Sequence, residues 1–323
     1  SLALSPVEAG LAASRCFFDT GYAFLRSGWE SKDLVFALQS GGGTCSRAHE
    51  HRDRNAFQFY AKGELFVCDP GHSCYRSPAH DGHDTQTFSH STWTLNRENQ
   101  QLAFLEKGME AEEARAYPSY HNLAVLSQQM HPQIAYVESQ ARRCYAPLWR
   151  DYTRRAFLVQ GRYLILWDTV DPGVRDGALR AAFLLNNAEG ALTLERDGDA
   201  WRVGRPKADL HMRFVTAAAY EAEVMDGLLH DAYHIHPGQA VQGRPGTGKR
   251  LELAFGAGPV SLATVLIPLD KDALPPKIEA AWEAGGRLAL TVQLEGWTDR
   301  FDFDPSNCPA ARYAREGGAH YEF

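Results

Sequence analysis

The chain has 323 residues, of which 44% are hydrophobic and 23% are charged, and its formal net charge is −7. Such a composition is typical of a globular protein with a large core, and the negative charge argues against a nucleic-acid-binding protein or one that binds anionic membranes. No apolar run approaches the roughly 20 residues of a membrane-spanning helix. Six cysteines are too few for a disulfide scaffold, although Cys68 and Cys74 are close enough either to bridge across a turn or to stay as thiols.

The chain begins with a capping-box pattern at residues 5–8, where Pro6 follows Ser5 and Glu8 lies three residues after it. This pattern predicts a short helix to about Ser14, within a helical lead-in over residues 1–15. Strand-like segments follow before a glycine-rich break at residues 41–43. These segments are residues 17–18, 22–26 and 34–38.

From residue 57 onward, alternating segments separated by turn dipeptides predict β-hairpins. The turn dipeptides are Lys62-Gly63, Gln160-Gly161 and Asp197-Gly198. Helical periodicity is credible only over residues 109–115 and 278–283, and residues 243–248 resemble a loop. The sequence therefore predicts one all-β domain over residues 1–323, either a β-sandwich or a large two-sheet barrel, with minor short helices.

Three residues near predicted strand ends have the chemistry of metal ligands. His49 and His51 would point to the same face of a strand, because residues two apart in a strand share a face. Asp69 lies at the end of the next hairpin strand, and His90 at the entry to a later strand. His51, Asp69 and His90 together suit zinc, and manganese or iron is also compatible with them.

Other histidines compete for this site, and the interval between Asp69 and His90 holds several of them. These are His72, His80 and His83. A second His-x-His pair at residues 234–236 has no acidic pattern nearby and is interpreted as a surface loop.

The same residues resemble a known family. The run from His49 to Tyr75, with Asp69-Pro70-Gly71 inside it, is similar to the signature of the heparinase II/III-like polysaccharide lyases, as are residues 89–92 and the hairpin over residues 152–168. The resemblance implies a large antiparallel β-sandwich of two stacked sheets. It also implies β-elimination on uronate-containing polysaccharides, such as a glycosaminoglycan or an alginate-like chain.

By position in this family, His51, Asp69 and His90 correspond to the zinc ligands, and His49 to a histidine of the catalytic cleft. We assign the metal a structural role beside that cleft, because it would fix the strand end that carries His49. Tyr75 is a further catalytic candidate. Arg54 and Arg76 are predicted to bind substrate.

The resemblance also implies partners. The sandwich is the C-terminal part of these lyases, and an (α/α) toroid supplies the principal acid and base. Residues 1–28 are too short to form one, so we expect a toroid on another chain or another part of a longer precursor. A secreted or periplasmic location is implied by the family, although the N-terminus has no signal-peptide pattern.

Two rival interpretations remain. A cupin-type metalloenzyme would share Gly43 and the His-x-His pair, but Asn55 and Ala56 stand where its glutamate is required. A non-catalytic carbohydrate-binding sandwich held together by zinc is the other rival.

Residues 243–249 resemble the sequence motif of a phosphate-binding loop. We reject a phosphate-binding site there, because Arg250 stands where the motif requires a hydroxyl residue.

Overall fold

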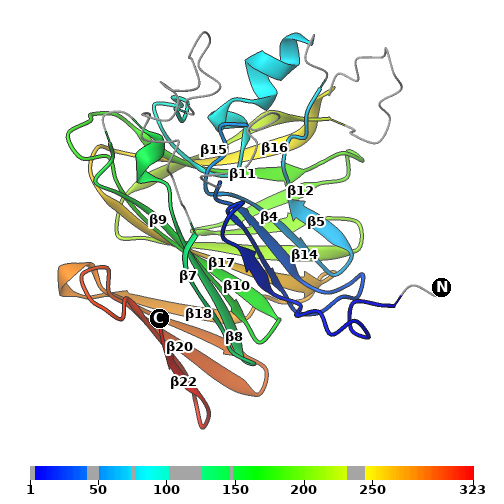
Figure 1. Ribbon diagram of the computed structural model, residues 1–323, viewed down its shortest axis with the longest axis vertical. Helices are drawn as coiled ribbons and strands as arrows, with labels where there is room; N and C mark the ends of the chain where they lie inside the picture. Colours follow the sequence, from blue (N-terminus) through cyan, green and yellow to red (C-terminus); the bar gives the residue numbers. More distant parts are fainter. Residues whose placement is uncertain (1–3, 42–50, 74–76, 102–124, 146–147, 231–243) are drawn as a thin grey trace.

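The computed structural model describes residues 4–41, 51–73, 77–101, 125–145, 148–230 and 244–323. It is an all-β molecule with two large antiparallel sheets stacked face to face, which confirms the predicted β-sandwich (Figure 1). The first sheet has nine strands in the order β1-β2-β3-β4-β5-β11-β16-β15, with β6 paired to β11. Its strands are β1 (Arg15–Phe17), β2 (Tyr22–Arg26), β3 (Val35–Gln39), β4 (Ala56–Ala61), β5 (Glu64–Val67), β6 (Trp93–Leu95), β11 (Leu179–Asn186), β15 (Tyr220–Leu229) and β16 (Arg244–Phe255).

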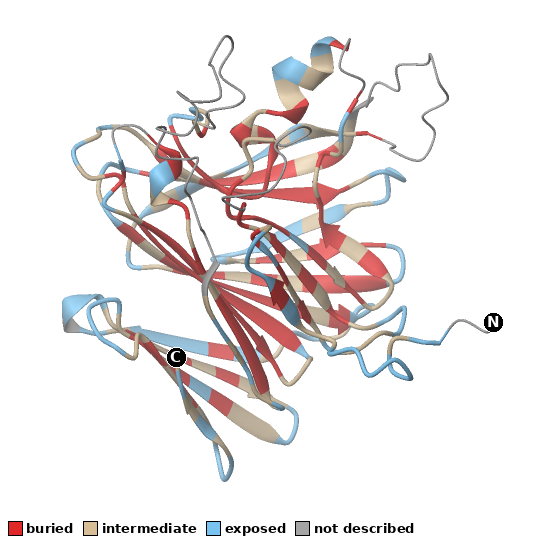
Figure 2. Cartoon of the chain, viewed as in Figure 1, coloured by how far each residue is buried: buried red, intermediate tan, exposed pale blue. Residues whose placement is uncertain are grey.

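The second sheet has eight strands in the order β12-β13-β14-β17-β10-β9-β8-β7. They are β7 (Val125–Met130), β8 (Ile134–Gln140), β9 (Asp151–Val159), β10 (Tyr163–Asp171), β12 (Thr193–Asp197), β13 (Ala200–Gly204), β14 (Ala208–Val215) and β17 (Val260–Asp270). The facing sides of the two sheets form one apolar core. The central strands of the eight-stranded sheet are coloured as buried along most of their length (Figure 2), because their other face is covered as well.

A third sheet of five strands follows at the C-terminus and lies against the outer face of the eight-stranded sheet. Its strands are β18 (Lys277–Trp282), β19 (Leu288–Leu294), β20 (Trp297–Phe303), β21 (Ala311–Arg315) and β22 (His320–Glu322). Phe301 and Phe303 pack there around Phe157 of β9, in a second apolar core. This extra layer was not predicted from the sequence.

The predicted hairpins are confirmed, because their turns contain residues with positive φ. Lys62 and Gly63 have φ of 53° and 79°, and Gln160 and Gly161 have φ of 54° and 64°. Two successive positive φ angles give a tight turn whose twist matches the flanking strands. The third hairpin joins β12 to β13, and its turn is formed by residues 198–199, one residue later than predicted.

Two local predictions are wrong. Residues 6–10 form a turn rather than a helix, although the Glu8 carboxylate accepts from the Ser5 backbone N–H at 2.8 Å as a capping box requires. Gly10 has φ of 67°, so the chain leaves the helical conformation after one turn. Residues 278–282 lie in β18, because pairing with β19 satisfies their backbone groups there.

Residues 244–248 belong to strand β16 rather than to a loop. The register of the pairing between β15 and β16 shifts at a bulge between Gly227 and Leu228 of β15. A Cβ on Gly248 would lie 3.1 Å from Leu184, so the absence of a side chain lets the strands approach.

The described helical segments are single turns: His80–Asp84, Thr87–Ser89, Arg142–Cys144 and Ala284–Gly286. In the part of the chain that the structure describes, no helix is long and apolar enough to cross a membrane.

A buried ion pair within the eight-stranded sheet also contacts the other side of the sandwich. Arg154 of β9 donates to both carboxylate oxygens of Asp168 of β10 at 2.8 Å, and both side chains are 1% exposed. The Arg154 guanidinium also donates to the carbonyl oxygens of Asn55 and Ser91, which belong to the nine-stranded side of the sandwich. Trp93 Nε1 donates to Asp168 at 2.9 Å, so the buried carboxylate is well satisfied.

We predict that Arg154→Met lowers the free energy of unfolding by about 3–5 kcal/mol, because it leaves the Asp168 carboxylate buried without its cation. Arg150→Met is the matched control, since the Arg150 side chain is 72% exposed and pairs with Asp171 at the surface. The control should change stability by no more than about 0.5 kcal/mol. Chemical denaturation of both variants measures this, and equal effects would contradict the prediction.

Candidate metal centre

The three predicted metal ligands meet in one cluster. His51 precedes β4, Asp69 follows β5, and His90 follows the helical turn Thr87–Ser89. One ligand atom from each of the three lies within 4.8 Å of the other two. The Gly71 backbone N–H donates to Asp69 Oδ1 at 2.9 Å, which orients the carboxylate at the turn after β5.

Both ring nitrogens of His90 face oxygen atoms of the cluster. Its Nε2 lies 2.9 Å from the Asp84 carbonyl oxygen, and a carbonyl only accepts, so Nε2 carries a proton. Its Nδ1 lies 3.0 Å from Asp69 Oδ2, which also only accepts when ionised. The Nδ1 lone pair must therefore hold either a second proton or a metal ion.

The charges of the cluster agree with this assignment. Burial alone lowers the pKa of His90, but the negative charge of Asp69 and its hydrogen bond more than offset burial and raise that pKa. Burial and the neighbouring His90 lower the pKa of His51 to about 4, so His51 is neutral near neutral pH. Zinc is compatible with these three groups: the neutral imidazole of His51, the carboxylate of Asp69, and the imidazole of His90, which can exchange a proton for the metal. A fourth position on zinc would stay open.

A second group of side chains surrounds the carboxylate of Asp84, the residue whose backbone carbonyl oxygen accepts from His90. The Asp84 carboxylate accepts from His230 Nε2 at 2.5 Å, from His83 Nδ1 at 3.1 Å, and from the Ser73 N–H and hydroxyl at 2.7 Å each. Burial raises the pKa of Asp84, but these donors outweigh burial and hold it far below its usual range. We assign this group to fixing the Asp84 carbonyl that orients His90.

The group of His83, Asp84 and His230 also has the composition of a metal site. Four donors already occupy the lone pairs of its carboxylate, however, and each imidazole nitrogen that faces Asp84 is used as a donor. Sequence reasoning missed Asp84 and His230 because they are 146 residues apart and share no motif.

Of the other four predicted site residues, the structure describes only Arg54. His49, Tyr75 and Arg76 lie outside the described residues. Arg54 is 3% exposed, and its guanidinium fills the space beside Gly41, where a Cβ would lie 2.1 Å from Nε. Such burial favours a structural role, and substrate binding by Arg54 stays a prediction.

The competing histidines are not part of the three-ligand cluster. His72 Nδ1 lies 2.9 Å from the Ser73 carbonyl oxygen, and His80 Nδ1 lies 2.7 Å from the carboxylate of its neighbour Asp81. Cys68 is a buried free thiol, and its Sγ lies 3.5 Å from the Leu184 carbonyl oxygen. Its predicted partner Cys74 lies outside the described residues, so the bridge between them stays a prediction.

A protein-family model described as heparinase II/III-like, C-terminal, matches residues 9–281. The chain belongs to the heparinase II/III-like family. This membership confirms the resemblance seen in the run from His49 to Tyr75. Comparison with curated proteins gives no match.

Solved structures of heparinases share the fold. Heparan sulfate lyase HepC from Pedobacter heparinus is 17% identical with a TM-score of 0.66, over 97% of this chain and 44% of its own. A structure named heparinase III is 15% identical with a TM-score of 0.69, over 90% of this chain and 42% of its own. This heparinase II/III-like chain therefore spans less than half the length of these structures.

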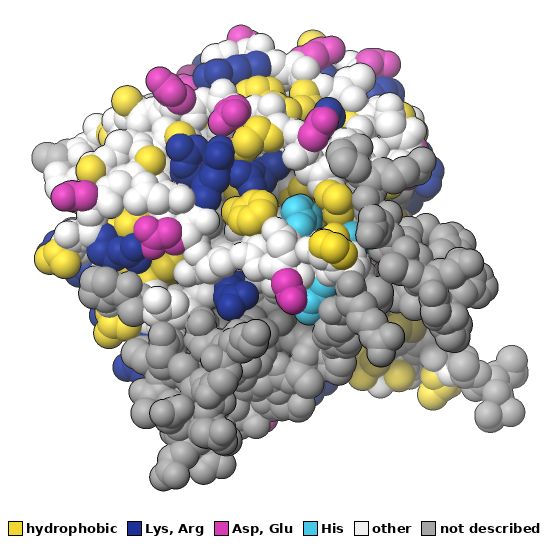
Figure 3. All heavy atoms as spheres, turned by 90° about the horizontal axis from the view of Figure 1, so that it is seen from above, with side chains coloured by type: hydrophobic (Ala, Val, Ile, Leu, Met, Phe, Trp, Pro, Cys, Tyr) yellow, Lys and Arg dark blue, Asp and Glu magenta, His cyan; other side chains and the backbone are white. Residues whose placement is uncertain are grey.

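In this family member, a cluster of arginines lies near the metal centre. Arg97, Arg180 and Arg250 all donate to the carboxylate of Glu252, which is 2% exposed. Arg97 also lies 3.4 Å from Glu223, so three cations face two carboxylates and one positive charge remains. Figure 3 shows Lys and Arg side chains gathered on this upper surface, near histidine and hydrophobic side chains.

The arginine cluster is connected to the metal centre. Arg250 donates to the Phe88 carbonyl oxygen at 2.6 Å, two residues before His90. Burial lowers the pKa of Arg250, and the positive charges of Arg97 and Arg180 lower it further. The negative charge of Glu252 acts in the opposite direction and raises that pKa. An anion bound here would relieve the repulsion among the three guanidinium groups.

We predict that the protein binds one equivalent of zinc and releases about one proton per zinc at pH 5.5. The proton comes from His90, whose pKa is raised and which is therefore protonated without metal, whereas His51 with a pKa of about 4 is already neutral. Zinc affinity should accordingly fall as the pH drops. Calorimetry in buffers of different ionisation enthalpy measures the proton count, and release of none or of two would contradict the assignment.

We also predict that Asp84→Asn weakens zinc binding about 10- to 100-fold, because an amide cannot accept from all four donors that now hold the Asp84 backbone in place. Asp81→Asn is the control, since Asp81 lies in the same turn with its side chain 88% exposed. Competition with a chromophoric chelator gives both affinities. Unchanged affinity in Asp84→Asn would show that the second group does not support the metal ligand.

Proposed function

We propose that this chain is the C-terminal half of a polysaccharide lyase that cleaves a uronate-containing polysaccharide by β-elimination. Family membership supports the class of enzyme. The observation that carries the proposal for this chain is the arginine cluster beside the candidate metal centre, because it places surplus positive charge there on a chain of net charge −7. An acidic polymer is the ligand that such a surface favours.

The chemistry requires three functions at the sugar. The proton α to the uronate carboxylate is weakly acidic, so the carboxylate must be neutralised while a base removes the proton and an acid protonates the leaving oxygen. We assign His49 to the neutralisation of the carboxylate or to assistance of the base. His51 lies two residues later, so holding His51 in the metal centre fixes the backbone that carries His49.

Bound zinc would supply a fixed positive charge and structural support beside the proposed cleft. Manganese or another divalent metal could bind the same side chains, because its ligand preferences overlap with those of zinc. His51, Asp69 and His90 would hold it. In this proposal the side chains of the sandwich orient the substrate carboxylate. Tyr75 and Arg76 follow Asp69 in the chain and are proposed to contact the substrate.

The principal acid and base are proposed to lie on an (α/α) toroid. The chain spans 42–44% of the length of the similar solved structures, so more than half of a comparable enzyme has no counterpart here. The toroid is then a partner domain or partner chain, and the cleft between it and the sandwich holds the acidic polysaccharide. A secreted or periplasmic location follows from a substrate of this kind.

We expect His49→Ala to lower kcat about 10²- to 10⁴-fold, the usual contribution of a positioned acid–base group, in the protein combined with its toroid. Ultraviolet absorbance of the unsaturated product measures the rate on uronate polysaccharides. His320→Ala, an exposed histidine of the third sheet, is the control. Zinc content should stay the same in both variants.

Two outcomes would contradict the proposal. Full activity of His49→Ala would remove the role assigned to His49. Clear turnover by the 323-residue chain without a toroid would refute the requirement for a partner. Binding of polysaccharide without turnover, even with the toroid present, would instead support the non-catalytic, zinc-held carbohydrate-binding sandwich.

A further inference from the structure

A groove lies where the turns of several hairpins meet, away from the metal centre. It consists of two adjoining hollows of about 360 and 220 Å³, which we term the distal groove. Ser27 and Gly161 line both hollows and so form the wall between them. A Cβ on Gly161, whose φ is 64°, would lie 2.6 Å from the Ser27 Cβ. Glycine therefore lets the turn between β9 and β10 approach the turn after β2.

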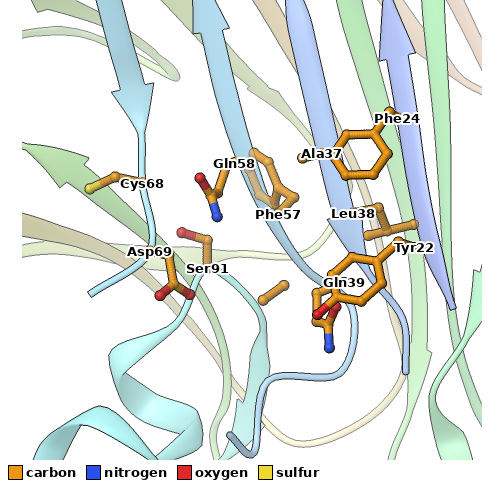
Figure 4. A pocket seen from close by; sticks show the side chains of 11 residues that line it. Tyr22, Phe24, Ala37, Leu38, Gln39, Phe57, Gln58, Cys68, Asp69 and Ser91 are labelled. Carbon is orange, nitrogen blue, oxygen red and sulfur yellow. The ribbon is translucent and has the colours of Figure 1, made fainter. Parts of the chain in front are cut away.

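The distal groove is separate from the metal centre, because β4 runs from one to the other. Ala56, the first residue of β4, lines a hollow together with Asp69 of the metal centre. Figure 4 shows Phe57 and Gln58, the next two residues of β4, at the same hollow. Ala61, the last residue of β4, lines the distal groove instead. Strands rise about 3.3 Å per residue, so the two ends of β4 lie roughly 17 Å apart.

The distal groove has an excess of positive charge. Among the described residues that line it, four side chains are cationic and one is a carboxylate. The cations are Arg26, Lys32, Lys62 and Arg162, and the carboxylate is that of Asp33. Lys62 also pairs with Asp270 at 2.7 Å. The four cations thus face two carboxylates, and two positive charges remain on a chain whose net charge is −7.

Aromatic rings hold the two arginines of the groove. The Arg26 guanidinium lies over the rings of Phe24 and Trp29, 5.0 and 4.6 Å from their centroids. The Arg162 guanidinium lies 4.2 Å from the centroid of the Trp297 ring. A cation–π contact fixes a guanidinium without neutralising its charge. Within the described residues neither arginine has a carboxylate within 4.0 Å, so both positive charges are available to a ligand.

The other groups of the distal groove favour a sugar as that ligand. Leu34, Ala61 and Ile267 form an apolar floor in the larger hollow, and all three are buried. Gln133 and Gln160 line the smaller hollow with amide groups. A uronate unit matches these features, because it has a carboxylate for the guanidinium groups, hydroxyls for the amides and an apolar ring face for the floor.

We propose that the distal groove is a second binding site for an acidic polysaccharide, with Arg26 and Arg162 as the residues that pair with its anionic groups. The nature of the polymer rests on the proposed lyase function, whereas the position and the charge of the groove do not. A long substrate held at this second point stays near the metal centre when one of its segments leaves the cleft.

The test uses the zinc-loaded protein and two hexasaccharides of equal length, one made only of uronate units and the neutral maltohexaose. Hydrogen–deuterium exchange locates the binding. We expect the uronate hexasaccharide to slow exchange of the backbone amides in residues 27–34 and 160–162, and maltohexaose to leave them unchanged.

The double substitution Arg26→Gln and Arg162→Gln should abolish this protection and weaken binding to the groove about tenfold, because each solvent-accessible charge pair contributes a few-fold. Lys32→Gln alters an exposed side chain without touching the aromatic rings, and it should weaken binding about two- to fourfold. Exchange measured at increasing concentrations of the hexasaccharide gives these affinities at the groove itself.

The double substitution Arg300→Gln and Arg312→Gln is the matched control, because these side chains of the third sheet are 63% and 41% exposed and do not line the groove. Zinc content and Tm show that each variant is folded. No protection of residues 27–34 in the unsubstituted protein, unchanged protection in the Arg26 and Arg162 variant, or equal protection by maltohexaose would overturn the second site. Protection at the groove without any unsaturated product from the protein combined with its toroid would support this site and refute the lyase proposal.

Discussion

The arrangement of the candidate site depends on the buried ion pair between Arg154 and Asp168. Taking both charges out of water is costly, and the pair is tolerated because it is bidentate and Trp93 Nε1 donates a further hydrogen bond to Asp168 Oδ2. Arg154 belongs to the sheet opposite the metal centre, yet its guanidinium holds the carbonyl oxygens of Asn55 and Ser91. Ser91 is next to His90 in the chain, and Asn55 is four residues after His51.

A second constraint fixes which nitrogen of His90 faces the metal position. The Asp84 carbonyl oxygen accepts a hydrogen bond from Nε2–H of His90, and Nδ1 of the same ring therefore faces Asp69. The carbonyl is itself held because the Asp84 carboxylate is surrounded by donors, among them His230 from the end of β15. The metal position is thus defined by two layers of side chains. The arginine cluster on the outer face of the nine-stranded sheet lies beside this position, because Arg250 donates to the Phe88 carbonyl oxygen.

Much of the fold and the first layer of the site follow from the sequence, because they depend on local signals. The dipeptides Lys62-Gly63 and Gln160-Gly161 require two positive φ angles and so give tight hairpins. The Lys62-Gly63 hairpin joins β4 to β5 and so returns Asp69 beside His51, which makes the spacing of these candidate ligands informative. The capping box of Ser5 and Glu8 also forms as expected, but Gly10 ends the turn before a helix develops.

The rest depends on contacts between distant parts of the chain. His230 reaches Asp84 across 146 residues, and Arg97 reaches Glu252 across 155. No spacing rule predicts such pairs. The third sheet was missed for a related reason: its strands bury their inner face against Phe157 of another sheet, and alternation alone does not say how many layers a chain forms.

Anomalous diffraction at the zinc absorption edge, from crystals grown with zinc, would locate the metal that we assign to the sandwich. We predict one strong peak within about 2.0–2.2 Å of an imidazole nitrogen of His51, Nδ1 of His90 and a carboxylate oxygen of Asp69. The absence of a peak there, or a peak between His83, Asp84 and His230 instead, would contradict it.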